Sequence, residues 1–327
     1  MPGPADHQPQ TDEVHVVTGA FGYTGRAIAR RLLAAGYRVR TLTNHPAVPD
    51  PFGGALEIAP LDFGDFEGLV RSLAGAAALY NTYWVRFPVR GVTHGHAVEN
   101  TLILMRAARD AGVRKFVHVS IANADRNSQL PYFRGKGMLE HQVANCGLPF
   151  AILRPTVIFG PGDILINNIA WMLRRFPVFA IPGDGAYRLQ PVYLEDLAAL
   201  AVDAAAQPAD AIVEAAGPEI FRFDELVRMI AGAVGSRARI VRARPALALA
   251  AARMLGALMR DVTLTREEFA GLSAELLVAG AAAAGRTRFS EWLSANAATL
   301  GRRYASEMAR RRAPRQGLQS PPAPIEK

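Results

Sequence analysis

Apolar and polar residues follow two different periods along the first half of the chain. Short apolar runs such as VHVV at residues 14–17 indicate buried strands, and stretches between them with an apolar residue every three or four positions indicate helices. This alternation with short connections predicts a parallel sheet that helices cover on both faces, with right-handed crossovers. The predicted strands lie at residues 14–17, 37–43, 56–61, 77–81, 115–120 and 150–154, and the clearest helices at residues 66–75, 96–111 and 131–145.

The pattern changes after Pro155. Gly- and Pro-containing loops alternate with predicted helices at residues 164–175 and 195–206, and a strand is predicted at residues 211–215. From Phe223 onward the pattern is mostly helical. Its longest apolar stretch is PALALAAARMLGALM at residues 245–259. The internal Arg253 and the modest length favour a helix packed on the sheet domain, or a subunit contact in a homodimer, over a helix on a membrane surface.

The first turn carries the first chemical signal. Residues 14–26 read VHVVTGAFGYTGR, which is a strand, a glycine-rich turn and the start of an amphipathic helix. Gly19 permits the turn, Gly22 lets backbone amides approach a pyrophosphate at the helix N-terminus, and Gly25 lets helix and strand pack closely. The spacing is Gly-x-x-Gly-x-x-Gly, and its context between strand and helix predicts a dinucleotide site. The predicted cofactor-binding residues of this turn are Gly19, Phe21, Gly22, Tyr23, Thr24, Gly25 and Arg26.

These patterns together predict an α/β protein, a Rossmann-type doubly wound parallel sheet with a smaller, mainly helical C-terminal substrate region. The predicted organisation is a flexible N-terminus at residues 1–12, a dinucleotide-binding domain at residues 13–155, a substrate region at residues 156–311 that returns to the core near residues 187–217, and a disordered basic, Pro-rich tail at residues 312–327.

Composition restricts the class of protein. The 327 residues are half hydrophobic, which is enough for a sizeable core, and the single cysteine, Cys146, excludes an internal disulfide and favours a reducing compartment. The net charge is +8, and residues 298–327 alone hold seven basic and two acidic residues, so we interpret the excess as a solvated end of the chain and expect no nucleic-acid partner. No signal-peptide pattern and no bilayer-length apolar run is present, which predicts a cytoplasmic protein without a membrane span.

A second motif follows the fifth strand, where Tyr132 and Lys136 stand four residues apart on a predicted helix. With the glycine turn, they make the chain resemble the extended and atypical short-chain dehydrogenase/reductases, the NAD-dependent epimerase/dehydratase group, over about residues 14–217. Further landmarks in the same order are Asp62, Asn81, Thr82 and Tyr83, Asn100, Ser120, Arg154 and Pro155, and the segment QPVYLED at residues 190–196.

The resemblance implies a set of roles. In that family a tyrosine hydroxyl passes a proton to or from a substrate oxygen while a hydride moves at the nicotinamide. Tyr132 would be the acid/base, Lys136 its electrostatic partner and ribose ligand, Ser120 a carbonyl-orienting donor, and Asn100 a support of the proton path. Residues i and i+4 share a helix face, so we expect the Lys136 ammonium near the Tyr132 phenol, where it favours the ionised form. Alternatively, Tyr132 is a packing residue and Lys136 a surface charge.

One interval departs from the family pattern. Ser120 precedes Tyr132 by only twelve residues, whereas active extended members have a longer interval. Ser120, Ser128 or Asn123 then fills the place of the third catalytic residue, or no residue does. Similar shortened members include the respiratory complex I accessory subunit and the nitrogen-metabolite repressor type, which bind the cofactor as subunits or sensors.

The end of the second strand bears on the choice of cofactor. NAD-selective sites place an acidic residue there, and the segment TLTNH at residues 41–45 has none, which favours NADP(H) over NAD(H). The candidate donors to a 2′-phosphate are Arg26, Thr43, Asn44 and His45. By resemblance, Asp62 contacts the adenine amine and Phe63 walls the ring, and the remaining predicted cofactor contacts are Asn81, Thr82, Tyr83, Lys136 and Pro155. Alternatively, Asp62 caps the following helix.

The substrate side rests on fewer residues. Trp84 and Arg86 follow the fourth strand, where ligands collect in such folds, and Arg86 suits an anionic or carbonyl-bearing ligand. Asn123 is the third candidate. Because His94 and His96 belong to no cluster with metal-ligand spacing, no metal is predicted.

The sequence therefore predicts an NAD(P)-dependent oxidoreductase or epimerase-like enzyme that acts on a small carbonyl or hydroxyl substrate, with sugar nucleotides among the candidates. The alternative is a non-catalytic NAD(P)H-binding sensor or an assembly or accessory subunit.

Overall fold

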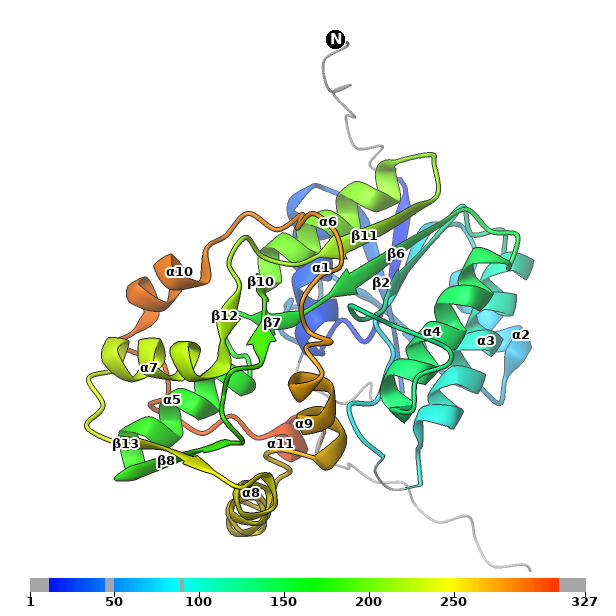
Figure 1. The fold of residues 1–327 in the computed structure, drawn as a ribbon. Coiled ribbons are helices and arrows are strands. Elements are labelled where there is room, and N and C mark those ends of the chain that lie inside the picture. Colours follow the sequence, from blue (N-terminus) through cyan, green and yellow to red (C-terminus); the bar gives the residue numbers. More distant parts are fainter. Residues whose placement is uncertain (1–11, 45–49, 89–90, 312–327) are drawn as a thin grey trace, which may run out of the picture.

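Seven parallel strands form the central sheet of the structure, a computed structural model that describes residues 12–44, 50–88 and 91–311 (Figure 1). The strand order is β11-β6-β5-β4-β1-β2-β3, so the direction of strand addition reverses beside β1. The strands are β1 (Val14–Thr18), β2 (Arg38–Thr43), β3 (Glu57–Pro60), β4 (Ala76–Asn81), β5 (Lys115–Val119), β6 (Phe150–Pro155) and β11 (Ala211–Ala215). The predicted fold class is confirmed. The predicted tail at residues 312–327 and nearly all of the predicted flexible N-terminus lie outside the described residues.

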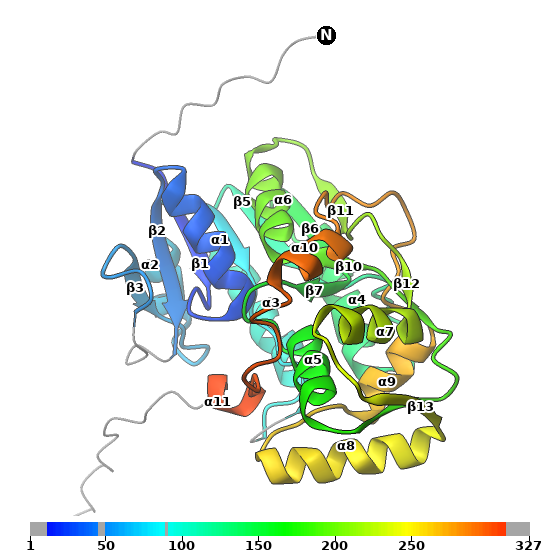
Figure 2. The same ribbon diagram turned by 90° about the vertical axis from the view of Figure 1, so that its left-hand side faces the viewer.

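Helices cover both faces of this sheet. α1 (Tyr23–Ala34) and α6 (Leu194–Ala206) lie together on one face, and α2 (Phe66–Leu73), α3 (His94–Asp110) and α4 (Pro131–Ala144) lie on the other (Figures 1 and 2). The apolar positions that the periodicity identified face the sheet, with Ile28 and Leu32 fully buried on α1. Burial of such side chains is what stabilises a parallel sheet between two helical layers.

A second lobe follows β6. It combines α5 (Leu165–Arg175), α7 (Phe223–Ala233), α8 (Pro245–Met259), α9 (Arg266–Ser273), α10 (Phe289–Asn296) and the short α11 (Glu307–Arg311) with three two-stranded sheets. These pairs are β7 (Val157–Phe159) with β10 (Pro191–Tyr193), β9 (Arg188–Leu189) with β12 (Phe221–Arg222), and β8 (Val178–Pro182) with β13 (Arg239–Ala243). The lobe has its own core around Phe159, Phe289 and Ile230.

Two features of this lobe differ from the sequence prediction. β13 pairs in parallel with β8, although the chain after Phe223 was expected to be mostly helical. Helix α8 packs against β8 and has no comparable contact with the seven-stranded sheet. Among the described residues, no helix combines the length and the apolar character needed to cross a membrane. The predicted domain boundaries and the cytoplasmic location stay predictions.

Candidate functional site

The glycine turn between β1 and α1 leaves no room for side chains. Gly19 has a positive φ of 66°, which glycine adopts without strain. The Gly22 amide donates to the Gly19 carbonyl oxygen over 2.8 Å. A Cβ on Gly25 would lie 2.4 Å from that oxygen, and one on Gly22 would lie 3.1 Å from it. Gly22 provides no side-chain cap to α1, and the first turn of α1 has no acidic residue. The helix N-terminus therefore fits the pyrophosphate of a dinucleotide.

A cavity of about 660 Å³ opens at the ends of β2 and β3. Asp62 lies exposed in its wall, and its carboxylate accepts from the Gly64 amide over 2.9 Å. The helix that follows is capped by Asp65, which accepts from the Gly68 amide over 2.8 Å, so the alternative that Asp62 caps this helix is wrong. The cavity is lined by Thr43, Asn44, Ile58, Ala59, Pro60, Leu61, Asp62, Phe63, Gly64 and Asn100. This shape and lining fit the adenosine end of the cofactor.

The residues predicted to select NADP(H) lie in different surroundings. Arg26 donates through Nη2 to the Phe21 carbonyl over 2.7 Å, so its guanidinium folds over the glycine turn. Thr43 is buried at the end of β2, Asn44 is exposed beside it, and His45 lies outside the described residues. Among the described residues that line the cavity, Asp62 is the only acidic one.

Hydrogen bonds beneath the turn join the ends of β1 and β4. The Thr82 amide donates to Thr18 Oγ1 over 2.8 Å, and Thr82 Oγ1 donates to the Thr18 carbonyl over 2.6 Å. Asn81 is fully buried, accepts from Thr18 Oγ1 over 3.3 Å and lies with Nδ2 3.1 Å from His118 Nδ1. The Asn81 and Thr82 side chains thus hold the floor of the site, as does Pro155, which is buried at the end of β6.

An aromatic side chain occupies the helix face that Tyr132 and Lys136 share on α4. The Trp84 indole centroid lies 4.4 Å from Lys136 Nζ, and its ring meets the Tyr132 ring edge-on at 5.6 Å. The Trp84 ring also stacks in parallel with the His94 ring, with 5.7 Å between the ring centroids. A Cβ on Gly135 would lie 2.9 Å from the indole. Trp84 therefore fills the space in front of Gly135.

The protonation states follow from this packing. Lys136 is 2% exposed and donates to the Val119 carbonyl over 2.7 Å. Burial lowers the pKa of Lys136 to about 7, although Glu140 opposes the shift. Burial and the Glu268 carboxylate raise the pKa of Tyr132 above its ordinary value. The expectation that Lys136 favours the ionised form of Tyr132 is wrong for this arrangement, because the phenol is desolvated and faces carboxylates.

The predicted catalytic residues Ser120 and Asn100 and the predicted substrate residue Asn123 each have different contacts. Ser120 is 3% exposed, and within the described part of the chain its hydroxyl has no hydrogen-bond partner. Asn100 donates to the Tyr83 hydroxyl over 2.8 Å and lines the cavity with Asp62. Asn123 donates to the carbonyl oxygens of Leu276 and Val278 over 3.0 and 2.8 Å. Asn123 thus holds the C-terminal segment in place.

Ser128, which was an alternative to Ser120, accepts from the Leu130 amide over 3.2 Å in the turn before α4. His96 forms a capping box with Thr93 at the start of α3.

Arg86 has its own counter-charges. It forms an ion pair with Glu268 on α9, and its Nη1 lies 4.0 Å from Glu307. Burial lowers the pKa of Arg86, but the attraction of Glu268 outweighs this and the pKa is raised. Arg86 therefore already has carboxylate partners, and its role toward an anionic or carbonyl-bearing ligand stays a prediction.

Sequence reasoning also missed Glu267, whose carboxylate accepts from the Tyr132 amide over 2.5 Å and caps α4 from α9. No local pattern signals this contact, because 135 positions separate the two residues.

The reversal of strand order beside β1, with the glycine turn at that point, defines a dinucleotide-binding protein of the Rossmann type. The model of the NAD dependent epimerase/dehydratase family matches residues 15–216, and the chain belongs to that family.

Relatives of several kinds share this similarity. The chain is 25% identical over 229 residues to NADH dehydrogenase (ubiquinone) 1 alpha subcomplex subunit 9, mitochondrial, of Arabidopsis thaliana. The aligned region covers 66% of this chain and 57% of the relative's length. It is 28% identical over 241 residues to ceramide reductase of Caulobacter vibrioides, covering 70% of this chain and 73% of the relative. The solved structure of Citrobacter sp. triphenylmethane reductase with NADP(H) superposes with a TM-score of 0.68 at 16% identity, covering 87% of this chain and 99% of that one. This last likeness shows the fold.

Proposed function

We propose that the protein is an NADP(H)-dependent oxidoreductase that interconverts a carbonyl and a hydroxyl group on a small substrate. The observation that carries the proposal is the position of Tyr132 and Lys136. They lie one helical turn apart, with Lys136 hydrogen-bonded to Val119, the last residue of β5. A protonated phenol on the helix that follows β5 would stand at the same edge of the sheet as the glycine turn, where ligands bind in such folds.

The proposed chemistry runs most easily in the direction of reduction. A bound nicotinamide would supply the hydride. Tyr132 is protonated at neutral pH, as a tyrosine with the ordinary pKa of 10 already is, so its hydroxyl is a proton donor to the developing alkoxide of a substrate carbonyl. Lys136 offers donors to ribose hydroxyls, and Trp84 turns away from Gly135 to admit the substrate.

Substitution of the phenol tests this role. Tyr132→Phe should lower turnover by about a hundred- to ten-thousand-fold, the usual contribution of general acid catalysis, with nearly unchanged cofactor affinity. The assay follows NADPH absorbance with a panel of sugar nucleotides, ceramides and small ketones. Full activity of Tyr132→Phe on a substrate that the wild type reduces would remove the tyrosine mechanism.

The preference for NADP(H) rests on the acid-free end of β2. Calorimetric titration should give NADPH an affinity about tenfold or more above that of NADH, because a charge-assisted hydrogen bond to the 2′-phosphate is available only to NADPH. Thr43→Asp, which restores a carboxylate there, should reverse the order. Equal affinities for the two cofactors in the wild type would contradict the proposal.

A second function, binding of NAD(P)H without turnover, is favoured by the Trp84 indole on the shared face of Tyr132 and Lys136. The similarity to the complex I subunit supports the same function. Trp84→Ala opens that face and separates the two. If the wild type and Trp84→Ala both bind NADPH equally well and neither reduces any member of the panel, the binding function is the better one.

A further inference from the structure

Helix α8 is apolar on nearly every side and yet lies on the surface. Its only buried residues are Ala248 and Gly256. Leu247, Met254 and Leu258 are 64, 75 and 77% exposed, and their spacing of seven and four residues places them along one stripe of the helix. Both views show α8 at the edge of the second lobe, with one side free of other elements (Figures 1 and 2). A helix that is apolar all round is ordinarily buried, so we infer that a binding partner covers the exposed face of α8.

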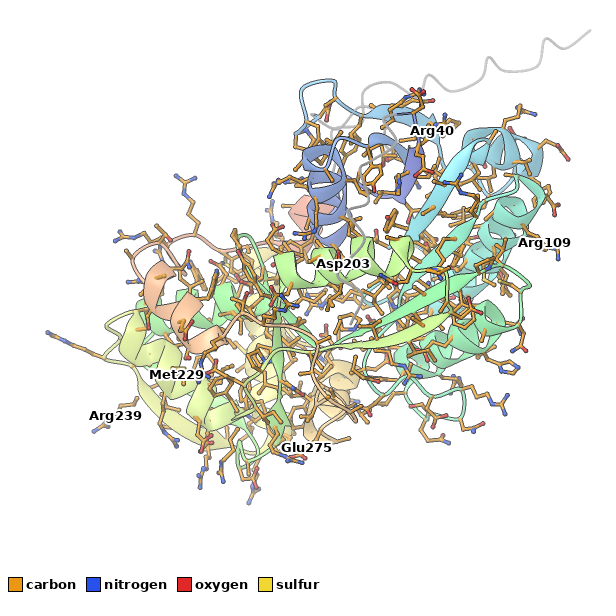
Figure 3. All side chains as sticks on the ribbon, turned by 90° about the horizontal axis from the view of Figure 1, so that it is seen from above. Arg40, Arg109, Asp203, Met229, Arg239 and Glu275 are labelled. Carbon is orange, nitrogen blue, oxygen red and sulfur yellow. The ribbon has the colours of Figure 1, made fainter. Side chains whose placement is uncertain are left out.

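Positive charge is concentrated in the segment that contains this stripe. Residues 226–260 contain seven arginines and no acidic residue, which nearly equals the net charge of +8 of the whole chain. All seven are exposed, and Arg239 projects from the outer edge of the lobe (Figure 3). Arg228 and Arg242 pair with Asp224. Within the described residues, no ion pair includes Arg237, Arg239, Arg244, Arg253 or Arg260.

We propose that this α8 surface, the stripe of Leu247, Met254 and Leu258 with its arginines, docks on an anionic lipid membrane. The aliphatic side chains enter the boundary between headgroups and acyl chains, and the guanidinium groups contact lipid phosphates. The inference is independent of the proposed oxidoreductase activity.

Charge and composition distinguish this partner from two others. A symmetric contact centred on α8 would place α8 on α8 of the second copy and bring the same acid-free set of arginines together, which repels. Single-stranded nucleic acids bind basic surfaces through aromatic stacking, and residues 226–260 contain no aromatic residue. Exposed aliphatic side chains together with arginines instead match a lipid membrane, which has anionic headgroups at its surface and apolar acyl chains beneath them.

The fold presents α8 as a fixed element. Asp261, directly after the helix, accepts from the Tyr304 hydroxyl and from the Glu307 and Met308 amides, each over 3.0 Å. A Cβ on Gly256 would lie 2.7 Å from the Asp261 carbonyl oxygen, so the end of the helix packs closely on this loop. Substitutions on the free stripe touch none of these contacts.

Vesicle sedimentation with the full chain tests the proposal. The protein should pellet with vesicles of phosphatidylcholine mixed equally with phosphatidylglycerol, pellet much less with phosphatidylcholine alone, and be released by high salt. The double variant Met254→Glu/Leu258→Glu should lower partitioning by roughly a hundredfold, because each apolar side chain contributes about a tenfold factor. The matched control Met138→Glu/Ile212→Glu adds the same charge at exposed apolar positions on α4 and β11 and should bind like the wild type.

A second pair of variants tests the charges. Arg244→Gln/Arg253→Gln should weaken binding by roughly fivefold for each arginine, and Arg30→Gln/Arg109→Gln on the sheet domain should not. Equal pelleting with neutral and anionic vesicles, or equal loss in both double-Glu variants, would overturn the proposal. So would a wild-type dimer that does not bind vesicles and that Met254→Glu/Leu258→Glu converts to monomers, because the α8 surface would then be a subunit contact.

Discussion

Burial of Lys136 makes the stability of the fold depend on pH in a predictable direction. The pKa of Lys136 is lowered from the ordinary lysine value of 10.5 to about 7. Between these values the unfolded chain holds a proton on this side chain that the folded chain has released. The free energy of unfolding must therefore rise as the pH increases from about 7 toward 10.5, and the destabilisation is fully present below pH 7.

The pKa values set the size of the effect. At about 1.4 kcal/mol for each pKa unit, the charged form of Lys136 destabilises the fold by about 4 to 5 kcal/mol below pH 7. About 2 kcal/mol of this should be recovered between pH 7 and pH 9, where the folded side chain is mostly neutral and the unfolded one still mostly charged.

Urea unfolding at these two pH values measures the difference. The wild type should gain about 2 kcal/mol relative to Lys136→Met, which has a similar shape and no titratable group at this position. Lys136→Arg keeps its charge at both pH values, so its free energy of unfolding, like that of Lys136→Met, should lack the increase between pH 7 and pH 9. A wild type whose pH dependence matches that of Lys136→Met would refute the reasoning, because the lysine would then be fully charged in the fold.

Two further substitutions, each with a comparison variant, probe helices that build the site. Gly25→Ala should destabilise the protein by about 1 to 3 kcal/mol and weaken NADPH binding, because its Cβ would lie 2.4 Å from a backbone oxygen. Gly232 is a helical glycine with open space around it, so Gly232→Ala should stabilise the protein by about 0.5 to 1 kcal/mol. Thermal unfolding and NADPH titration of both variants decide this. Glu267→Ala should cost about 1 kcal/mol through loss of the cap on the Tyr132 amide, and Glu99→Ala at an exposed position on α3 should leave the urea midpoint unchanged.

Features determined by neighbours in sequence were predictable. The strands of the sheet and the helices around it follow from local periodicity, and the glycine turn follows from the need for a positive φ and for close approach at Gly25. The acid-free end of β2 is also a local feature. The role of Asp62 was less clear, because Asp62 and Asp65 both precede α2, and only the hydrogen bond to Gly68 identifies Asp65 as the cap.

Features determined by distant parts of the chain were not predictable. Arg86 meets Glu268 from a position 182 residues later, and Glu267 reaches Tyr132 from a position 135 residues later. Strand β13 was not predicted from the sequence for a related reason. Its sequence RIVRA is only five residues long and lacks a strict polar–apolar alternation, and its pairing with β8 joins residues about sixty positions apart.

The shared face of Tyr132 and Lys136 shows where the inference from spacing ends. A separation of four residues places two Cβ atoms on the same side of a helix, and it leaves the ends of the side chains to whatever fills the space between them. Here Gly135 creates that space, and the Trp84 indole enters it from the end of β4. The ring shields Lys136 from water, which favours the neutral amine, and the carboxylates of α9 favour the neutral phenol. In the proposed oxidoreductase function, these two residues would influence each other's protonation only after Trp84 moves, so the position of the indole would determine whether the pair can act.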